Sequence, residues 1–242
     1  MCNRYTLDAF APDLAANYHL VGAPQLPARF NIAPLQFVPV IGLKPDRTTR
    51  GLAMMRWGLV PRWSRGSRPR AYVTARAETA HELPAFCDSV RHRRCLIPAS
   101  GFYEWAREGV REPPYHFRRR DGGPMTFAGL WDRWTGPAGP VLTCCILTTR
   151  ANELVRPVQD RMPAVLGPAV FARWLDPAAD VDDVRRLLRP CQAGELEAVP
   201  VSTLVNDVWN DGPDLLAPVV GPPSPAPFAR PPTGMIRWPS GR

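Results

Sequence analysis

Short apolar runs of β-type composition, separated by turn residues, are the feature that most limits how this chain can fold. Clusters of Gly, Pro and Asp stand between the runs, as in RDGGP at 120–124 and GPAGP at 136–140. Apolar and β-branched runs bounded in this way are typical of β-strands. We therefore expect strands in the segments 36–43, 52–60, 71–75, 95–105, 114–117, 125–134 and 141–149.

Helical patterns are fewer in this sequence. Pro12 suits the first turn of a short helix, and further helices are expected near 151–158, over 168–175 and over 181–189, where apolar residues share one face. Many short strands with few helices predict an α+β domain. We expect a curved, mainly antiparallel β-sheet with a barrel-like core and peripheral helices, without internal repeats.

The C-terminal part of the chain has a different composition. Proline becomes dense from Gly212 onward, and proline residues cannot supply the N–H groups that ladders and helices need. We therefore expect one domain over residues 2–218 and a Pro/Arg-rich, disordered tail over 219–242.

The positive net charge of the chain favours binding to a polyanion. Its 242 residues carry a formal net charge of +8 with a pI near 9.7, and clustered arginine favours binding to nucleic acid. Lys44 is the only lysine among the 30 basic residues. GC-rich coding would produce the same bias, so a purely compositional origin of the charge stays open.

Six cysteines occur at positions 2, 87, 95, 144, 145 and 191, without a C-x-x-C pair or zinc spacing. We expect no metal or cofactor, and small buried apolar roles for all except Cys2. A signal peptide and a membrane span are not apparent. The expected location is the cytoplasm, at the nucleoid when the protein is bound to DNA.

Cys2 directly follows the initiator methionine in MCNRY. Removal of Met1 would leave an α-amine, with an ordinary pKa of about 7.7–8.0, beside a thiol. Such a 1,2-aminothiol forms an imine with an aldehyde and then closes a thiazolidine ring. The ring-opened deoxyribose of an abasic DNA site is one such aldehyde, although an inert second-position cysteine remains the alternative.

Eight sequence blocks give this chemistry a context. They are, in order, MCNRY, RFNIAP, MRWGLVPRW, ARAET, RCLIPASGFYEW, LTTRAN, DRMPAVL and VSTLVND. This ordered set closely resembles the SOS-response-associated peptidase (SRAP) family, also called abasic-site processing proteins, over residues 2 to about 218.

The resemblance implies a single α+β domain with a positively charged channel for single-stranded DNA. It implies removal of Met1 by the protein's own peptidase activity, followed by a thiazolidine crosslink between Cys2 and an abasic site that shields the lesion. The expected partner is single-stranded DNA containing abasic sites, and the expected state is a monomer that does not bind membranes.

The resemblance also assigns residues to the site. Cys2 matches the nucleophile and Glu104 the catalytic glutamate, for which a structural carboxylate paired with arginine is the alternative. Arg4 and Arg76 match positions that hold the DNA backbone, or else form ordinary ion pairs, Arg76 with Glu78 or Glu104.

Four more residues are assigned to DNA binding. Asn31 and Thr148 resemble polar groups that line the pocket, with bonding to turn backbone as the alternative. Trp57 is a candidate for stacking on a DNA base, and Trp63 is a candidate with less support. The alternative for both tryptophans is a place in the hydrophobic core. Arg161 either contacts phosphate or braces the site through a carboxylate.

Three positions depart from the family pattern. Thr74 stands in place of an active-site asparagine, Gln159 in place of a catalytic histidine, and Asn3 in place of a glycine. Glutamine cannot take or deliver a proton near neutral pH. We therefore expect slowed crosslinking. A non-crosslinking DNA-damage binder is the first alternative function, and a cysteine peptidase acting in trans is the second.

Overall fold

The computed structural model describes residues 3–8, 11–20, 22, 26–67, 69–106 and 113–219. Its strands are β1 (Tyr5–Leu7), β2 (Arg29–Ile32), β3 (Phe37–Leu43), β4 (Arg50–Trp57), β5 (Thr74–Arg76), β6 (Arg94–Ala99), β7 (Gly101–Glu104), β8 (Tyr115–Arg119), β9 (Met125–Gly136), β10 (Gly139–Arg150), β11 (Arg161–Pro163) and β12 (Leu196–Pro200). Its α-helices are α1 (Ala11–Tyr18), α2 (Cys87–His92), α3 (Phe171–Leu175) and α4 (Val181–Arg186), and short 3-10 turns span Pro168–Val170, Ala193–Glu195, Thr203–Asn206 and Pro213–Leu216.

Five strands close into a barrel. The pairings run β10–β4–β3–β6–β9 and return to β10, and all are antiparallel except β10–β4. Strands β5 and β11 add to the other part of β10, β5 in parallel. The predicted α+β class with a barrel-like, mainly antiparallel core is therefore confirmed.

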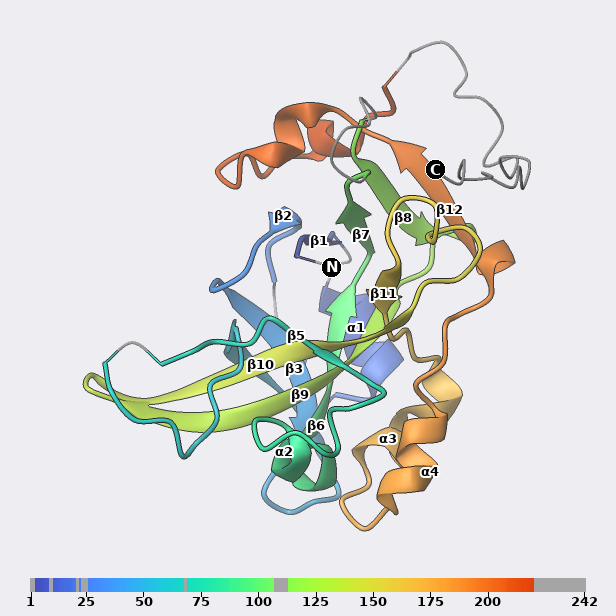
Figure 1. Cartoon of the computed structure of the whole chain (residues 1–242). Coiled ribbons are helices and arrows are strands. Elements are labelled where there is room, and N and C mark those ends of the chain that lie inside the picture. Colours follow the sequence, from blue (N-terminus) through green and yellow to red (C-terminus); the bar gives the residue numbers. More distant parts are fainter. Residues whose placement is uncertain are drawn as a thin grey trace, which may run out of the picture.

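A second sheet stands above the barrel in the order β12–β8–β7–β1–β2 (Figure 1). The predicted strand 95–105 links the two sheets, because it breaks at Ser100 into β6 of the barrel and β7 of the upper sheet. Gly101 is required at this crossing, since a Cβ there would lie 2.3 Å from Nε2 of His116. Glu104 thereby ends the strand that rises out of the barrel.

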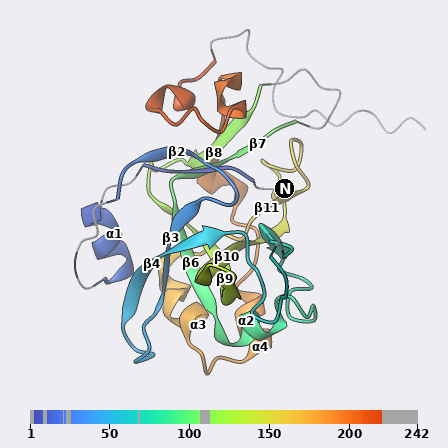
Figure 2. The same ribbon diagram turned by 90° about the vertical axis from the view of Figure 1, so that its left-hand side faces the viewer.

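The described residues form two large apolar clusters, and a third, small one surrounds Tyr103 in the upper part of the molecule. One large cluster lies inside the barrel and under the upper sheet, and the other lies between the barrel and the helices, which Figure 2 shows at its lower end and side. Cys144 belongs to the first and Cys145 to the second, because consecutive strand residues face opposite sides. Both thiols are fully buried, as is Cys95, which confirms the apolar role predicted for these three.

Helix predictions are confirmed in part. Helices occupy residues within three of the predicted segments, namely after Pro12, over 168–175 and over 181–189. The helix expected near 151–158 is wrong, because the segment forms consecutive turns in which the Asn152 side chain accepts bonds from the N–H groups of Leu154 and Val155. Asn side chains of this kind compete with helix formation.

The end of the described chain is held in the fold. Leu215 is buried, and the N–H of Val219 donates to the carbonyl of Pro200 at 2.9 Å. The rest of the predicted tail, residues 220–242, lies outside the described residues. No helix within the described parts of the chain is long and apolar enough to cross a membrane.

Candidate active site

Glu104 is a carboxylate in an apolar position at the end of β7. Glu104 is only 2% exposed, and this burial raises the pKa of its carboxyl group from 4.5 to about 7. A hydrogen bond with the side chain of Gln159 opposes the rise. A carboxyl group with this pKa accepts or donates a proton near neutral pH, as general acid–base chemistry requires.

The N-terminal strand runs toward Glu104. In the antiparallel register, Tyr5 lies opposite Phe102 and Thr6 opposite Gly101, and the N–H of Tyr103 donates to the carbonyl of Arg4 at 3.0 Å. The same register carries Asn3 to the level of Glu104. Cys2, the predicted nucleophile, directly precedes Asn3 in the sequence and lies outside the described residues.

Gln159 comes from a loop that closes on itself. The N–H of Ala151 donates to the carbonyl of Asp160 at 2.9 Å, and the N–H of Gln159 donates to the carbonyl of Val155 at 2.9 Å. The loop thus places Gln159 against Glu104, from which it is separated by 55 positions, although sequence reasoning gave no contact between the two. The position that departs from the family pattern is a direct neighbour of the buried carboxyl.

Arg161 pairs with a carboxylate, which is the contact that one of its two predicted roles, bracing the site, requires. Its guanidinium binds both carboxylate oxygens of Glu78 at 2.8 Å and also donates to the carbonyl and hydroxyl oxygens of Thr148. Thr148 is fully buried. Thr148 therefore positions Arg161 from inside the sheet. Because both carboxylate oxygens of Glu78 bind Arg161, Glu78 is not available to pair with Arg76.

Thr74 and Arg76 lie at the two ends of β5. Thr74 is partly buried and pairs in register with Ile146, and Arg76 pairs with Thr148. The side chain of Arg76 is exposed, and in the described part of the chain it makes no ion pair. Arg76 is therefore accessible to an anionic ligand.

Arg4 and Asn31 form a second cluster. Arg4 donates to Oδ1 of Asn31 at 2.7 Å and to the carbonyl of Val205 at 2.8 Å, and its guanidinium lies 5.6 Å from the ring centre of Trp105. Asn31 is fully buried and its amide donates to the carbonyls of Val205, Asp207 and Asn210. Asn31 thus holds the 203–211 segment. This contact agrees with the alternative prediction for Asn31, in which its side chain bonds to turn backbone.

Replacement of Asn31 by aspartate is expected to destabilise the fold by about 3 kcal/mol, because the new oxygen would face backbone carbonyls that now receive N–H donors. For a chain of this size the melting temperature should fall by roughly 6–12 °C. Asn206→Asp is the matched control, since Asn206 is exposed and, among the described residues, its side chain bonds through its acceptor oxygen, toward Trp105. Thermal denaturation of both variants checks the difference, and equal melting temperatures would contradict it.

Trp57 is a core residue in this structure. It has no exposed surface, its ring packs edge-on against Tyr5 at 5.2 Å, and its indole N–H donates to the carbonyl of Val73 at 2.9 Å. A base cannot reach its ring faces in this conformation, so the structure does not support the predicted stacking role. Trp63, by contrast, is 57% exposed.

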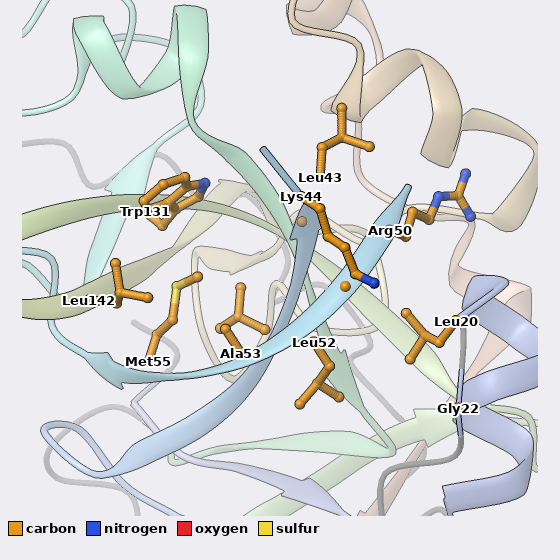
Figure 3. A pocket seen from close by; sticks show the side chains of 13 residues that line it. Leu20, Gly22, Leu43, Lys44, Arg50, Leu52, Ala53, Met55, Trp131 and Leu142 are labelled. Carbon is orange, nitrogen blue, oxygen red and sulfur yellow. The ribbon is translucent and has the colours of Figure 1, made fainter. Parts of the chain in front are cut away.

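A cavity of about 560 Å³ lies away from all these residues, on the face formed by β3, β4, β9 and β10 (Figure 3). Its walls are mostly apolar, with Lys44 and Arg50 at one end. None of the predicted site residues lines it. Among the described residues there is also no group of three or more His, Cys, Asp or Glu side chains that could hold a metal ion.

Comparison with known proteins finds relatives of this chain. The model of the family described as SOS response associated peptidase (SRAP) matches residues 1–208. The abasic site processing protein YoqW of Bacillus subtilis is 34% identical over 223 residues, which is 89% of this chain and 99% of the relative. The abasic site processing protein HMCES of Gallus gallus is 32% identical over 80% of this chain and 65% of its own length.

Solved structures share the fold. A protein from Bacteroides thetaiotaomicron superposes with a TM-score of 0.79 at 24% identity, over 90% of this chain and all of that one. A protein from Bordetella bronchiseptica superposes with a TM-score of 0.71 at 28% identity, over 83% of this chain and all of that one.

Proposed function

The chain belongs to the SOS response associated peptidase (SRAP) family, and from this premise we propose that it captures abasic sites in single-stranded DNA through a covalent link to Cys2. The first step is hydrolysis of the Met1–Cys2 peptide bond, which frees the α-amine. The observation that carries the proposal is the buried carboxyl of Glu104, with a pKa of about 7, at the end of the strand that pairs with the N-terminal strand β1.

The proposed reaction joins the aminothiol to the aldehyde of the opened sugar. The amine adds to the aldehyde carbon, and water leaves to give an imine. The thiol then adds to the imine carbon, its proton passes to the nitrogen, and a thiazolidine ring closes. The net change is the loss of one water molecule. Glu104 would protonate the departing hydroxyl and then, as a carboxylate, accept a proton from the thiol.

The basic residues have distinct parts in this proposal. Arg76, which is exposed, would contact a phosphate directly. Arg161 would act through Glu78 and Thr148 by fixing the ends of β5 and β10. Arg4 and Asn31 would hold the 203–211 segment beside the start of the chain.

The proposal is tested by mixing the protein with a single-stranded oligonucleotide that carries one abasic site. The expected product survives a denaturing gel, and its intact mass equals the protein without Met1 plus the oligonucleotide minus one water. An unmodified oligonucleotide is the control. Absence of the adduct, in a sample whose mass proves that Cys2 is N-terminal, would overturn the proposal.

Gln159→His is expected to accelerate crosslinking, because histidine transfers protons near neutral pH and glutamine does not. A general acid or base at this position typically contributes about 10²–10⁴-fold in rate, and Glu104 already supplies part of that function. Single-turnover crosslinking rates of the two proteins check the prediction. An unchanged rate would mean that Glu104 or water performs the proton transfers alone.

A second candidate function is binding of damaged single-stranded DNA without crosslinking. Thr74 and Gln159 favour it, since both lack the groups that the family pattern has at these positions. Retention of affinity for abasic DNA without any adduct in the wild-type protein would select this function.

A further inference from the structure

The loop that carries Gln159 also forms one wall of a basic cleft. This cleft has a volume of about 570 Å³. Its lining residues are Arg76, Glu78, Thr79, Arg150, Ala151, Arg156, Asp160 and Arg161. Arg150 and Arg156 were not among the predicted site residues, although the LTTRAN block contains Arg150.

The strand register forces arginines together in this cleft. Arg150 lies directly opposite Arg161 across β10 and β11, and Arg76 pairs with Thr148 on the other side of β10. Like charges directly opposite one another in a sheet are destabilising. Acidic groups or bound anions that neutralise the charge would therefore stabilise this arrangement.

Acidic groups neutralise only part of it. The hydrogen bond from Arg161 lowers the pKa of Glu78, so Glu78 is ionised and balances Arg161. Asp160 is the other acidic residue of the cleft, against Arg76, Arg150 and Arg156. Within the described parts of the chain, none of these three arginines makes an ion pair, and all three side chains are exposed. The cleft thus has two uncompensated positive charges.

The position of Arg156 is defined by the loop backbone. Its N–H donates to the carbonyl of Asn152 at 2.9 Å, in the turn that the Asn152 side chain caps. The same loop directs Gln159 to Glu104, one residue before Asp160 of the cleft. An anion held by Arg150 and Arg156 would therefore lie next to the candidate active site.

We propose that Arg150 and Arg156, together with Arg76, bind the phosphodiester of a nucleotide that flanks the lesion. This inference rests on the proposed function for the identity of the ligand. Arginine suits the role because its planar fork donates two parallel hydrogen bonds to phosphate oxygens. A repeating polyanion gains from several such contacts, and each contact releases counterions, which makes binding dependent on salt.

The test measures binding of an undamaged single-stranded oligonucleotide, which requires no chemistry at Cys2. Arg150→Ala and Arg156→Ala are each expected to weaken binding by about tenfold. Each should also lower the slope of log K against log salt by about 0.7, the value for one phosphate contact with a single strand. Arg120→Ala is the matched control. It removes the same charge from an exposed residue after β8 that does not line the cleft.

A second arm identifies the phosphate. Methylphosphonate linkages, which are uncharged, are placed one at a time around the abasic site. One linkage should weaken binding by the wild-type protein but not by the Arg150→Ala/Arg156→Ala double variant. Inorganic phosphate is added separately, and displacement of the oligonucleotide at millimolar phosphate but not at equal chloride would assign the cleft to free phosphate and overturn the proposal.

The outcomes separate this inference from the proposed function. If the wild-type protein crosslinks to abasic DNA while both arginine variants bind like Arg120→Ala, the cleft proposal fails and the function stands. If the arginine variants lose affinity and salt dependence while no adduct forms, the cleft proposal stands and the covalent function fails.

Discussion

Replacement of Cys2 by serine is expected to abolish the adduct that survives denaturation, while affinity for undamaged single-stranded DNA stays within about twofold. In a sample whose intact mass shows that Met1 has been removed, serine keeps the free α-amine, so the imine can still form. Its hydroxyl is a far weaker nucleophile than a thiolate, and the oxygen analogue of the ring is not expected to persist. The proposed phosphate contacts are made by arginines and do not involve position 2, which is why binding should be retained.

The experiment distinguishes the two steps of the reaction. Borohydride reduces an imine to a stable amine, so treatment during incubation should restore an adduct to Cys2→Ser. Cys87→Ser serves as the control, because Cys87 is a partly exposed thiol elsewhere in the chain and its loss should change neither product. A denaturation-stable adduct formed by Cys2→Ser without reduction would show that the thiol is not required.

Glu104→Gln is expected to slow crosslinking by about 10²–10⁴-fold, the usual contribution of a general acid–base group. The same substitution should stabilise the fold at alkaline pH. Burial raises the pKa of Glu104 from 4.5 to about 7, so the folded protein holds a proton that the unfolded chain releases. Between these two values the stability of the wild-type protein falls as pH rises.

The magnitude follows from the shift. A difference of about 2.5 pKa units corresponds to roughly 3 kcal/mol of unfolding free energy. The wild-type protein keeps this free energy below pH 4.5 and has lost all of it above pH 7. Glutamine has no charge to desolvate, so Glu104→Gln should exceed the wild type in unfolding free energy at pH 8 and match it near pH 4.5. Urea denaturation at the two pH values measures this difference.

Glu153→Gln is the control for this variant, since Glu153 is exposed on the loop that also carries Gln159. Its stability should follow the wild type at both pH values. If Glu104→Gln were less stable than the wild type at pH 8, the carboxylate would have to be stabilised by partners, and its assignment as an acid–base group would fail. A gain in stability together with an unchanged crosslinking rate would show that Glu104 is buried as described but takes no part in the reaction.

Gln159 and Glu104 show why sequence blocks can point to candidate site residues without giving the contacts between them. Each belongs to, or directly precedes, a block of the family pattern, namely GFYEW and DRMP. Their hydrogen bond depends on how the 151–160 loop folds back on β10, and that loop had been predicted to be helical. The capping bonds of Asn152, which are local, were the available signal for a turn.

The arginines illustrate the same limit. Sequence reasoning left open whether Arg76 or Arg161 would take an acidic partner, because both lie near acidic residues in the sequence. The structure joins Arg161 to Glu78 across 83 positions and leaves Arg76 without an ion pair among the described residues. Arg150 and Arg156 were not predicted to belong to the site. The β10–β11 register places Arg150 opposite Arg161, and the loop after β10 brings Arg156 to the same cleft.

The sequence by itself determined most of the strand segments, the α+β class, the second-position cysteine and the membership of a family, because turn residues, apolar runs and ordered motifs are properties of neighbouring residues. The short strands β1, β2, β11 and β12 were not predicted. The tertiary structure decided that Trp57 is buried, that Asn31 holds a distant loop, and that Glu104 lies where burial raises its pKa. These outcomes depend on which strand faces meet when the barrel closes and the upper sheet covers it. Exposure and pairing across such contacts are set by the whole fold, and the local pattern of one segment does not contain them.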